Sequence, residues 1–422
     1  MRLHPDQSAP NDNTRAAFGF ILVTVVLDTL AFGVMAPVLP KLLVTLRGGN
    51  VAGAATTLGI FGTAWAIMQF LASPVLGSLS DRFGRRPVIL LSQVGLGLDY
   101  VLMALAPNVW WLFAGRLLSG VTGAGWTTAS AYIADITPPD ERAKRFGYVG
   151  AAWGFGFIVG PAFGGLLAGI DLRAPFWAAA ALCLVNAVYG LFILPESLPP
   201  DKRSPFAWRN ANFFGSLTLL RSTPTLLAVA IAMFFLTLGH DVNPVIAVIY
   251  SQFRYAWTEQ QVGLMLGVVG VCSIVVQALF VGPIVKRVGE QRALALGLAS
   301  GVVSFLIYAY ADHGWMFLAG IPLGAFFGLA GPSMQGIATR SVGESQQGQL
   351  QGALGSITSI ATMIAPMLFT QSFAAGVAWT AQPRAVGLPY VIAAVCLLGA
   401  YWLVGRIATA TARAPGSMPT AL

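Results

Sequence analysis

Long stretches of this 422-residue chain carry no charged side chain, and this feature limits its fold more than any other. A helix that crosses a bilayer needs about 20 mostly apolar residues. Segments without Lys, Arg, Asp or Glu that are close to that length or longer include 48–80, 117–134, 146–170, 174–195, 260–285, 293–311, 314–339, 345–383 and 385–405. The pattern predicts a chain that crosses a membrane many times.

The composition excludes several classes of protein. Charged residues make up 9% of the chain and hydrophobic residues 56%, whereas soluble domains carry about 25% charged residues. A soluble enzyme, a nucleic-acid-binding domain and a disordered regulator are therefore excluded, and the net charge of +8 is scattered rather than gathered in a patch. Cys183, Cys272 and Cys396 lie within apolar runs, so we expect no disulfide framework and no metal site.

Twelve membrane spans are expected when stretches interrupted by single charges are included. They lie near 17–39, 54–79, 88–106, 109–133, 146–169, 175–195, 224–250, 261–284, 292–310, 314–339, 350–374 and 386–407. The predicted fold class is thus an all-α membrane protein with two six-helix bundles. We predict an N-terminal bundle at 1–195, a cytoplasmic linker at 196–223 and a C-terminal bundle at 224–422.

Orientation follows from the positions of the basic residues. With the N-terminus inside, eighteen of the 24 Lys and Arg residues lie in inner segments and five in outer loops. Because basic residues favour the cytoplasmic side, both termini are predicted to be cytoplasmic. Residues 1–16 lack the order of a signal peptide, so we expect no cleavage.

The two halves of the chain repeat at a constant offset of 205 residues. The first-half members Gly77, Gly84, Trp110, Gly115, Gly147, Gly150 and Pro161 recur as Gly282, Gly289, Trp315, Gly320, Gly352, Gly355 and Pro366. A parallel repeat of this kind favours a transporter with its substrate site between the halves.

Charges within the repeat are distributed unequally. The first half carries Asp28, Asp81, Asp99 and Arg116 where the second half has Met233, Lys286, Ser304 and Ile321. We therefore expect the residues for ion coupling in the first half, and we expect the second half mainly to line the substrate site.

Several motifs resemble those of a known family. Residues 77–87 read GSLSDRFGRRP, LFAGRLLSG surrounds Arg116, and Gly156, Gly160, Pro161, Gly164 and Gly165 form a glycine-rich motif in the fifth span. The loop is similar to the signature loop of the major facilitator superfamily, and the fifth span resembles the antiporter motif of drug:proton exchangers. Together with Leu27-Asp28 and Leu98-Asp99-Tyr100, the first half resembles the tetracycline efflux pumps.

This resemblance implies a proton-coupled antiporter that exports an amphiphilic, ring-bearing drug by alternating access. The proton gradient is the expected driving force, with no cofactor and no nucleic-acid partner. The resemblance further implies a monomer in the bacterial inner membrane and a role in multidrug or tetracycline resistance. It also suggests a conformational latch that comprises Gly77, Asp81, Gly84, Arg85 and Asp135.

Each of these motifs has a simpler interpretation. The basic residues of the loop satisfy the positive-inside rule alone, although that rule does not explain Asp81. For the latch, we expect Asp81 to accept hydrogen bonds from the start of the eleventh span, near 348–352, and Arg85 to pair with Asp135. The glycines of the fifth span are equally consistent with ordinary close packing.

Asp28, Asp99 and Arg116 are the candidate proton-coupling residues. An ionisable group at the bilayer centre costs about 2.5–3.5 kcal/mol, which makes it a candidate functional site. Asp99 and Arg116 are equally distant from the turn at 107–108, and both lie roughly 13 Å from it at 1.5 Å per residue. We expect them to pair, with Asp28 or Asp99 as the proton-binding group; a static buried pair is the alternative for Asp99 and Arg116.

Polar and aromatic residues within the spans are candidates for substrate binding. They are Gln69, Gln277, Phe234, His240 and Asn243. Histidine titrates near pH 6.5, but His240 and Asp241 are expected toward the outer end of their span, where a solvated cavity mouth explains them.

The resemblance to tetracycline pumps fails at two positions. Many of those pumps carry a histidine in helix 8 and an acid in helix 9, where this chain has Ser273 and Gly301. Tetracycline remains the leading named substrate. The alternatives are a symporter or facilitator of a small metabolite and a membrane receptor that does not transport.

Overall fold

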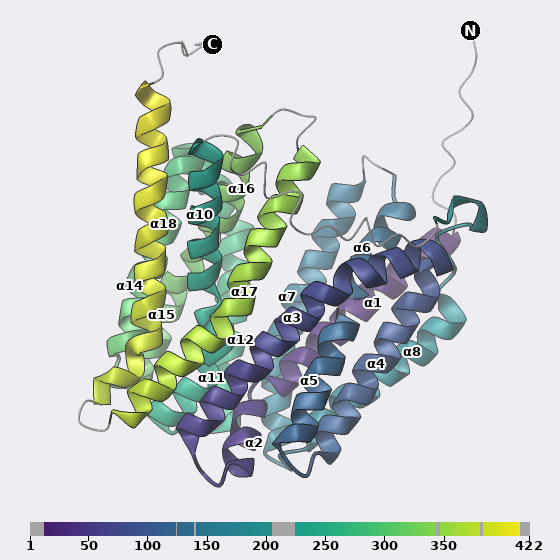
Figure 1. Cartoon of the computed structure of the whole chain (residues 1–422), viewed down its shortest axis with the longest axis horizontal. Coiled ribbons are helices and arrows are strands. Elements are labelled where there is room, and N and C mark those ends of the chain that lie inside the picture. The colour runs from purple at the N-terminus through teal and green to yellow at the C-terminus, as the bar shows by residue number, and fades with distance from the viewer. Residues whose placement is uncertain are drawn as a thin grey trace. The chain divides into compact units, whose positions relative to one another are not determined.

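The computed structural model describes residues 12–123, 125–138, 141–204, 224–342, 347–379 and 383–413. Within these ranges the regular structure is helical and no strand is found (Figure 1). This result confirms the predicted all-α fold class.

Helices of the first half follow the predicted spans closely. They are α1 (Asp12–Met35), α2 (Leu39–Leu46), α3 (Val51–Phe83), α4 (Arg85–Leu105), α5 (Val109–Gly123), α6 (Gly125–Asp135), α7 (Arg142–Ala168) and α8 (Ala174–Ile193), followed by the short 3-10 helix η1 (Pro200–Lys202).

Helices of the second half include three irregular segments. They are α10 (Pro224–His240), α11 (Val242–Tyr255), α12 (Glu259–Val275), the π-helical segment η3 (Val276–Val281), α13 (Gly282–Val288), α14 (Glu290–Tyr310), α15 (Gly314–Ala325), the 3-10 segment η4 (Phe326–Leu329), α16 (Ala330–Arg340), α17 (Gln347–Ala378), η6 (Pro383–Gly387) and α18 (Leu388–Arg413).

Eleven helical segments of the described residues are long and apolar enough to cross a membrane. The twelfth predicted span, near 109–133, corresponds to α5 and α6, which lie on either side of residue 124. The first span extends beyond its predicted end, because α2 continues it to Leu46. The chain is thus a multi-pass membrane protein.

A proline follows three of the places where the helices of the second half are interrupted. Proline has no amide hydrogen for the carbonyl four residues earlier, and its ring crowds that carbonyl. Pro244 follows the break between α10 and α11, Pro283 follows η3, and Pro332 follows η4. The carbonyls that lose their helical donor belong to His240, Leu279 and Gly328.

The 205-residue repeat is visible in the structure. Helix α14 begins and ends 205 residues after α4. The glycine before each helix, Gly84 or Gly289, has a positive φ, of 103° or 81°. Only glycine adopts such angles without strain, so both halves use the same device to begin this helix.

Contacts divide the described residues into two compact units. The first comprises residues 12–39, 67–204 and 259–267, and the second comprises 40–66, 224–258 and 268–413 within the described ranges. The start of α3 therefore belongs to the second unit and the start of α12 to the first. The predicted domain boundaries stay a prediction, and residues 205–223 of the predicted linker lie outside the described residues.

We call this assignment of the starts of α3 and α12 the exchange of helix ends, and contacts between glycine and proline stabilise it. In the second unit, a Cβ on Gly62 of α3 would lie 2.7 Å from the Pro366 Cβ of α17, and the Thr63 hydroxyl donates a hydrogen bond to the Met363 carbonyl (3.0 Å). In the first unit, a Cβ on Gly263 of α12 would lie 2.5 Å from the Pro161 carbonyl oxygen of α7. Pro161 and Pro366 are equivalent in the repeat. Equivalent prolines therefore pack against the start of α12 in the first unit and the start of α3 in the second.

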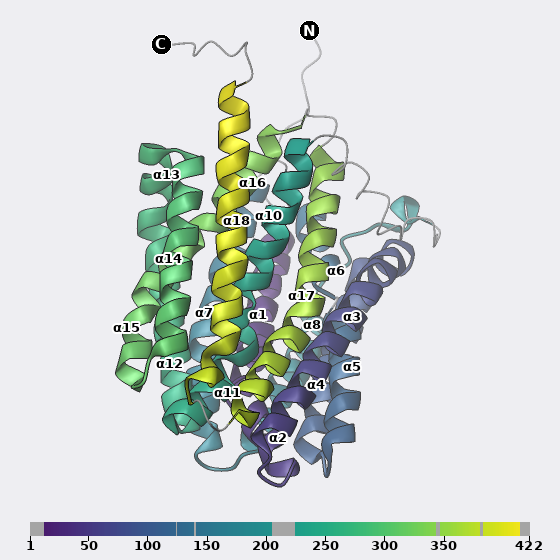
Figure 2. The same ribbon diagram turned by 60° about the vertical axis from the view of Figure 1, so that its left-hand side comes forward.

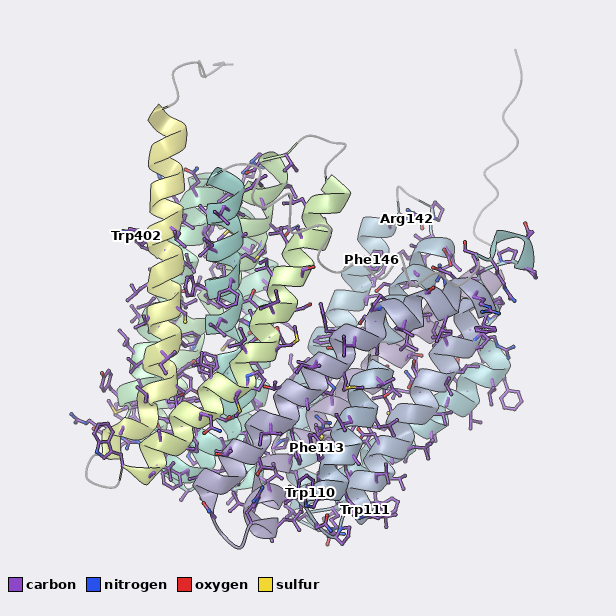
Figure 3. All side chains as sticks on the ribbon, in the orientation of Figure 1. Trp110, Trp111, Phe113, Arg142, Phe146 and Trp402 are labelled. Atoms are coloured by element: carbon purple, nitrogen blue, oxygen red, sulfur yellow. The ribbon has the colours of Figure 1, made fainter. Side chains whose placement is uncertain are left out.

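Within the second unit, α10 packs beside α17 and α18, and all three run side by side in both ribbon views (Figure 1 and Figure 2). Exposed aromatic residues occur near helix ends, as is typical of membrane interfaces. Trp110 and Trp111 begin α5, whereas Arg142 and Phe146 lie at the opposite end of the first unit on α7 (Figure 3).

Candidate functional site

Asp28 lies on α1, half-buried inside the first unit. The Gln93 side-chain amide of α4 donates a hydrogen bond to Asp28 Oδ2 (2.7 Å). Asp28 Oδ1 is buried and has no hydrogen-bond partner among the described residues. This carboxyl group therefore has a neutral amide as its partner instead of a cation.

Asp99 of α4 and Arg116 of α5 are brought together in the interior of the first unit. Asp99 is fully buried, and its Oδ2 lies 3.9 Å from Arg116 Nη2. The same guanidinium nitrogen contacts the thioether sulfurs of Met35 (3.3 Å) and Met103 (4.0 Å). The distance of 3.9 Å exceeds that of a hydrogen bond, so the two charges are neighbours without a direct hydrogen bond.

The equivalent position of the second unit is arranged differently. A Cβ on Gly115 would lie 2.5 Å from Asp99 Oδ1, so only glycine leaves room for this carboxylate. In the second unit Ser304 replaces Asp99, and its hydroxyl donates a hydrogen bond to the Gly320 carbonyl (3.1 Å). The repeat therefore holds a satisfied hydroxyl in one unit and an unsatisfied carboxylate in the other.

The glycine-rich motif of α7 packs against the part of α1 that follows Asp28. A Cβ on Gly156 would lie 2.6 Å from the Thr29 Cβ, and one on Gly160 would lie 2.8 Å from the Gly33 Cα. Gly164 contacts Val34 in the same way.

Other residues of the motif extend these contacts within the first unit. Pro161 also lies against Gly33, and Gly165 contacts the backbone of Glu259 at the start of α12. The motif therefore brings the α7 backbone close to the helix that carries the candidate proton-binding residue.

Arg85 connects the loop between α3 and α4 to the end of α6. Its Nη1 donates hydrogen bonds to Asp81 Oδ1 (2.5 Å) and Ser80 Oγ (2.6 Å), and its Nε donates to Asp135 Oδ2 (3.2 Å). Ser197 also donates to Asp135 (3.1 Å). The structure thus brings Asp81, Arg85 and Asp135 into one network.

Glu196 is a functional candidate that the sequence did not reveal. Its carboxylate accepts hydrogen bonds from the backbone amides of Arg85 (2.8 Å), Arg86 (3.3 Å) and Leu198 (3.0 Å). A carboxylate at a helix N-terminus satisfies free amides and interacts favourably with the helix dipole. A Cβ on Gly84 would collide with this carboxylate, so the glycine of the loop makes room for the Glu196 cap.

The remaining part of the predicted latch stays a prediction. No described atom lies within 4 Å of the position that a Cβ on Gly77 would occupy. The expected partner of Asp81 lies near 348–352, and the side chains of residues 343–349 are outside the described part of the chain.

The candidate substrate-binding residues are divided between the units. Gln69 belongs to the first unit, whereas Phe234, His240, Asn243 and Gln277 belong to the second. Phe234 and Asn243 lie on either side of the break between α10 and α11. Gln277 lies in η3, and its Cγ is 3.7 Å from the position of a Cβ on Gly328 in η4.

His240 ends α10 and Asp241 stands between α10 and α11. The described part of this span runs from Leu226 to Tyr255. Their expected position toward the outer end stays a prediction, because residues 205–223 lie outside the described part of the chain.

Sequence reasoning also missed the long-range partners of the candidate residues. Gln93 is a polar residue in an apolar span, and this signal alone pointed to it. Glu196 is an acid directly after the sixth predicted span. Met35, Met103 and Thr362 carry no such signal, because their roles depend on contacts between helices.

Comparisons with known proteins agree with the resemblance noted in the sequence. Residues 21–366 match the Major Facilitator Superfamily, as do residues 229–417. The chain is 40% identical to the tetracycline resistance protein, class C, of Escherichia coli over 365 residues, which cover 85% of this chain and 91% of that protein.

Two further proteins are similar over most of their length. Multidrug resistance protein 2 of Bacillus subtilis (strain 168) is 30% identical, and the match covers 84% of this chain and 88% of that protein. A crystal structure of the nucleoside transporter NupG aligns with a TM-score of 0.75 at 12% identity, covering 93% of this chain and 99% of that one. At this identity the second likeness concerns the fold alone. The chain therefore belongs to the major facilitator superfamily, a family of membrane transporters and not of enzymes.

Proposed function

We propose that this protein is a proton-coupled antiporter that exports an amphiphilic, ring-bearing compound, with tetracycline as the leading substrate. The names of its relatives support a drug-like substrate, since they are tetracycline and multidrug resistance proteins. The observation that carries the proposal is the environment of Asp28, a carboxyl group whose hydrogen-bond partner among the described residues is a neutral amide.

Asp28 is suited to bind and release a proton. A carboxylate held by a cation would lose a strong interaction whenever it became protonated. The hydrogen bond from Gln93 reaches only Asp28 Oδ2, and Oδ1 has no described partner. Protonation of Asp28 therefore costs no ion pair, and it neutralises a charge within a membrane span.

Asp99 and Arg116 form a second ionisable pair whose interaction depends strongly on geometry. Their closest atoms are 3.9 Å apart, and the guanidinium also rests against Met35 and Met103. Thioether groups are flexible and weak acceptors, so they restrain Arg116 little. A small movement of Arg116 changes the charge that Asp99 experiences, and proton binding can thereby follow conformation.

The glycine motif links these groups to helix movement. Gly156 and Gly160 contact Thr29, Leu30 and Gly33, which follow Asp28 on α1. Small residues allow two backbones to approach and to slide without interlocking side chains. We infer that α7 and α1 shift against each other during transport and that this shift changes access to Asp28.

The loop network acts as the conformational latch in this proposal. Arg85 bonds to Asp81 and Asp135, and Glu196 holds the start of α4. The substrate is bound by Gln69, Gln277, Phe234, His240 and Asn243. The protein functions as a monomer in the bacterial inner membrane, with both termini in the cytoplasm.

Reconstitution into lipid vesicles tests this proposal. An imposed pH gradient is followed with a pH-sensitive dye while tetracycline and other ring-bearing compounds are added one at a time. We expect at least one compound to dissipate the gradient in vesicles that contain the protein and not in empty vesicles. Compound movement that is the same with and without a gradient would contradict antiport and support a facilitator.

A further inference from the structure

An ionisable pair, His240 and Asp241, lies within a membrane span of the second unit. Asp241 stands between α10 and α11 in the span Leu226–Tyr255. Phe327 lies in η4, within the span Gly314–Arg340.

The Asp241 carboxylate is held from two directions. Thr362 of α17 donates a hydrogen bond to its Oδ2 (2.9 Å), and His240 Nδ1 lies 3.2 Å from its Oδ1. An ionised carboxylate only accepts hydrogen bonds. The hydrogen of the neutral imidazole must therefore be on Nδ1, and Nε2 is left as an acceptor.

The imidazole also has a defined orientation. Its ring is stacked on Phe327, with 5.8 Å between ring centres and 24° between ring planes. The next residue, Gly328, lies beside the Gln277 side chain of η3. The imidazole thus lies on an aromatic ring close to a side-chain amide, while 60% of the His240 side chain is exposed.

Asp241 is the charged group that faces His240. Among the described residues, neither α17 nor η4 carries a titratable side chain, and Arg340 is the last residue of α16. The helix α18, which also packs on α10, contributes Tyr390, Cys396 and Tyr401 along its described side chains. Tyrosine and cysteine are ordinarily neutral near pH 7, and the titratable residues of α11, Tyr250, Arg254 and Tyr255, follow Asp241 by at least nine residues. Among the residues that the structure describes, Asp241 is therefore the charged group next to the imidazole.

An ionisable pair within a membrane span has a cost that ordinary packing does not explain. Such groups within spans almost always face the bundle interior or a water-filled cavity and mark pathways for substrates or ions. His240 combines this position with an exposed ring, whereas Asp241 is mostly covered. The exposed imidazole is therefore the part of the pair that is available to a ligand.

We propose that His240, positioned by Asp241 and Thr362, binds a ring hydroxyl group of the substrate. This inference rests on the proposed function, because it assigns a contact to the exported compound. The neutral imidazole accepts a hydrogen bond from an O–H group at Nε2. The protonated imidazole donates one from Nε2 to the same oxygen once that oxygen has lost its proton. Phenols and enols can supply both forms, and the stacked rings of His240 and Phe327 suit an aromatic compound.

The first experiment examines, in the absence of substrate, whether Asp241 and Thr362 position the His240 ring. The chain has three histidines, His4, His240 and His313, so isotope-labelled histidine gives few NMR signals in the purified full-length protein. His240→Gln assigns the signal of interest. We expect the neutral His240 ring to carry its proton on Nδ1, and Asp241→Asn and Thr362→Val to change the tautomer populations.

Two matched variants serve as controls for these changes. Thr358→Val makes the same substitution one turn earlier on α17, and Asp171→Asn removes a carboxylate from the turn before α8. Both are expected to leave the His240 signal unchanged. Unchanged tautomer populations in Asp241→Asn would overturn the positioning role.

The second experiment measures the equilibrium binding of tetracycline as a function of pH. Loss of a hydrogen bond to a charged or strongly polar partner weakens binding about tenfold or more. We expect that loss in His240→Gln, together with a flatter pH profile around the titration of histidine. Thr358→Val should bind like the unmodified protein.

Failure of this inference can be distinguished from failure of the proposed function. If tetracycline drives proton exchange but His240→Gln has the unmodified affinity and pH profile, the inference is overturned while the proposed function stands. If the unmodified protein neither binds nor exchanges tetracycline, the named substrate is wrong and the proposed contact between His240 and its ring hydroxyl is wrong with it.

Discussion

Asp28 and Gln93, which are 65 residues apart in the chain, are joined by one hydrogen bond of 2.7 Å between α1 and α4. This contact gives a buried carboxyl group an uncharged partner. The remaining oxygen of Asp28 and the Gln93 carbonyl oxygen both lack a described partner. One hydrogen shared between these two oxygens would satisfy both, and protonation of Asp28 can supply it.

Asp28→Asn should abolish transport driven by a pH gradient while the protein still inserts into the membrane. The substitution preserves the size of the side chain but removes the group that binds the proton. Everted membrane vesicles with tetracycline as the probe measure the uphill step, and immunoblotting measures the amount of protein. Asp171→Asn, in an exposed turn, should transport normally. Unimpaired uphill transport by Asp28→Asn would exclude Asp28 as the coupling residue.

Arg116→Met should destabilise the protein by about 3 kcal/mol, because it leaves the carboxylate of Asp99 buried without a cation. The double variant Asp99→Asn, Arg116→Met should recover at least half of that loss, since neither charge remains. Thermal unfolding of the purified protein in detergent measures both effects. Single-variant losses that simply add in the double variant would show that the two groups do not interact.

Gly160→Ala should lower stability by about 1–3 kcal/mol, the usual cost of inserting a methyl group into a packed contact. The new Cβ would lie 2.8 Å from the Gly33 Cα and 2.9 Å from the Leu30 carbonyl oxygen. Gly150→Ala on the same helix meets no described atom within 4 Å and serves as the matched control. Equal unfolding temperatures for the two variants would contradict close packing of α7 on α1.

Gly84→Ala should be more destabilising than Gly289→Ala. Both glycines have a positive φ with ψ near 160°, and an alanine in that conformation costs about 1–3 kcal/mol. Only at Gly84 does the new Cβ also meet a neighbour, the carboxylate of Glu196, whereas no described atom lies near Gly289. The repeat therefore provides a control that separates backbone strain from the collision.

Glu196→Ala in the Gly84→Ala background tests the collision directly. We expect the second change to cost less there than in the unmodified protein, because the cap at the start of α4 is already displaced. Loss of a helix cap costs about 1 kcal/mol, and unfolding temperatures of the four proteins report the coupling. Fully additive temperatures would mean that Gly84 does not serve to accommodate Glu196.

The spans were predictable because apolar length alone decides whether a segment crosses a membrane. The proximity of Asp99 and Arg116 was also predictable, since two helices joined by a tight turn place residues equally distant from the turn at the same depth. Each of these conclusions depends on neighbours in the sequence or on residues on either side of one turn.

The partners of the candidate residues were not predictable in the same way. Gln93 meets Asp28, and Thr362 meets Asp241, across 65 and 121 residues. No periodicity or spacing in one sequence specifies which helix lies next to which. The end of a span is likewise the least certain part of such a prediction.

The exchange of helix ends has a consequence for how the gene can be divided. A fragment that stops after α8 would keep the first turns of α3 but lack α17, the helix against which Gly62 and Thr63 pack. The complementary fragment would keep the start of α12 without α7. Two such fragments, expressed from separate genes, should each be degraded when made alone and be recovered when made together.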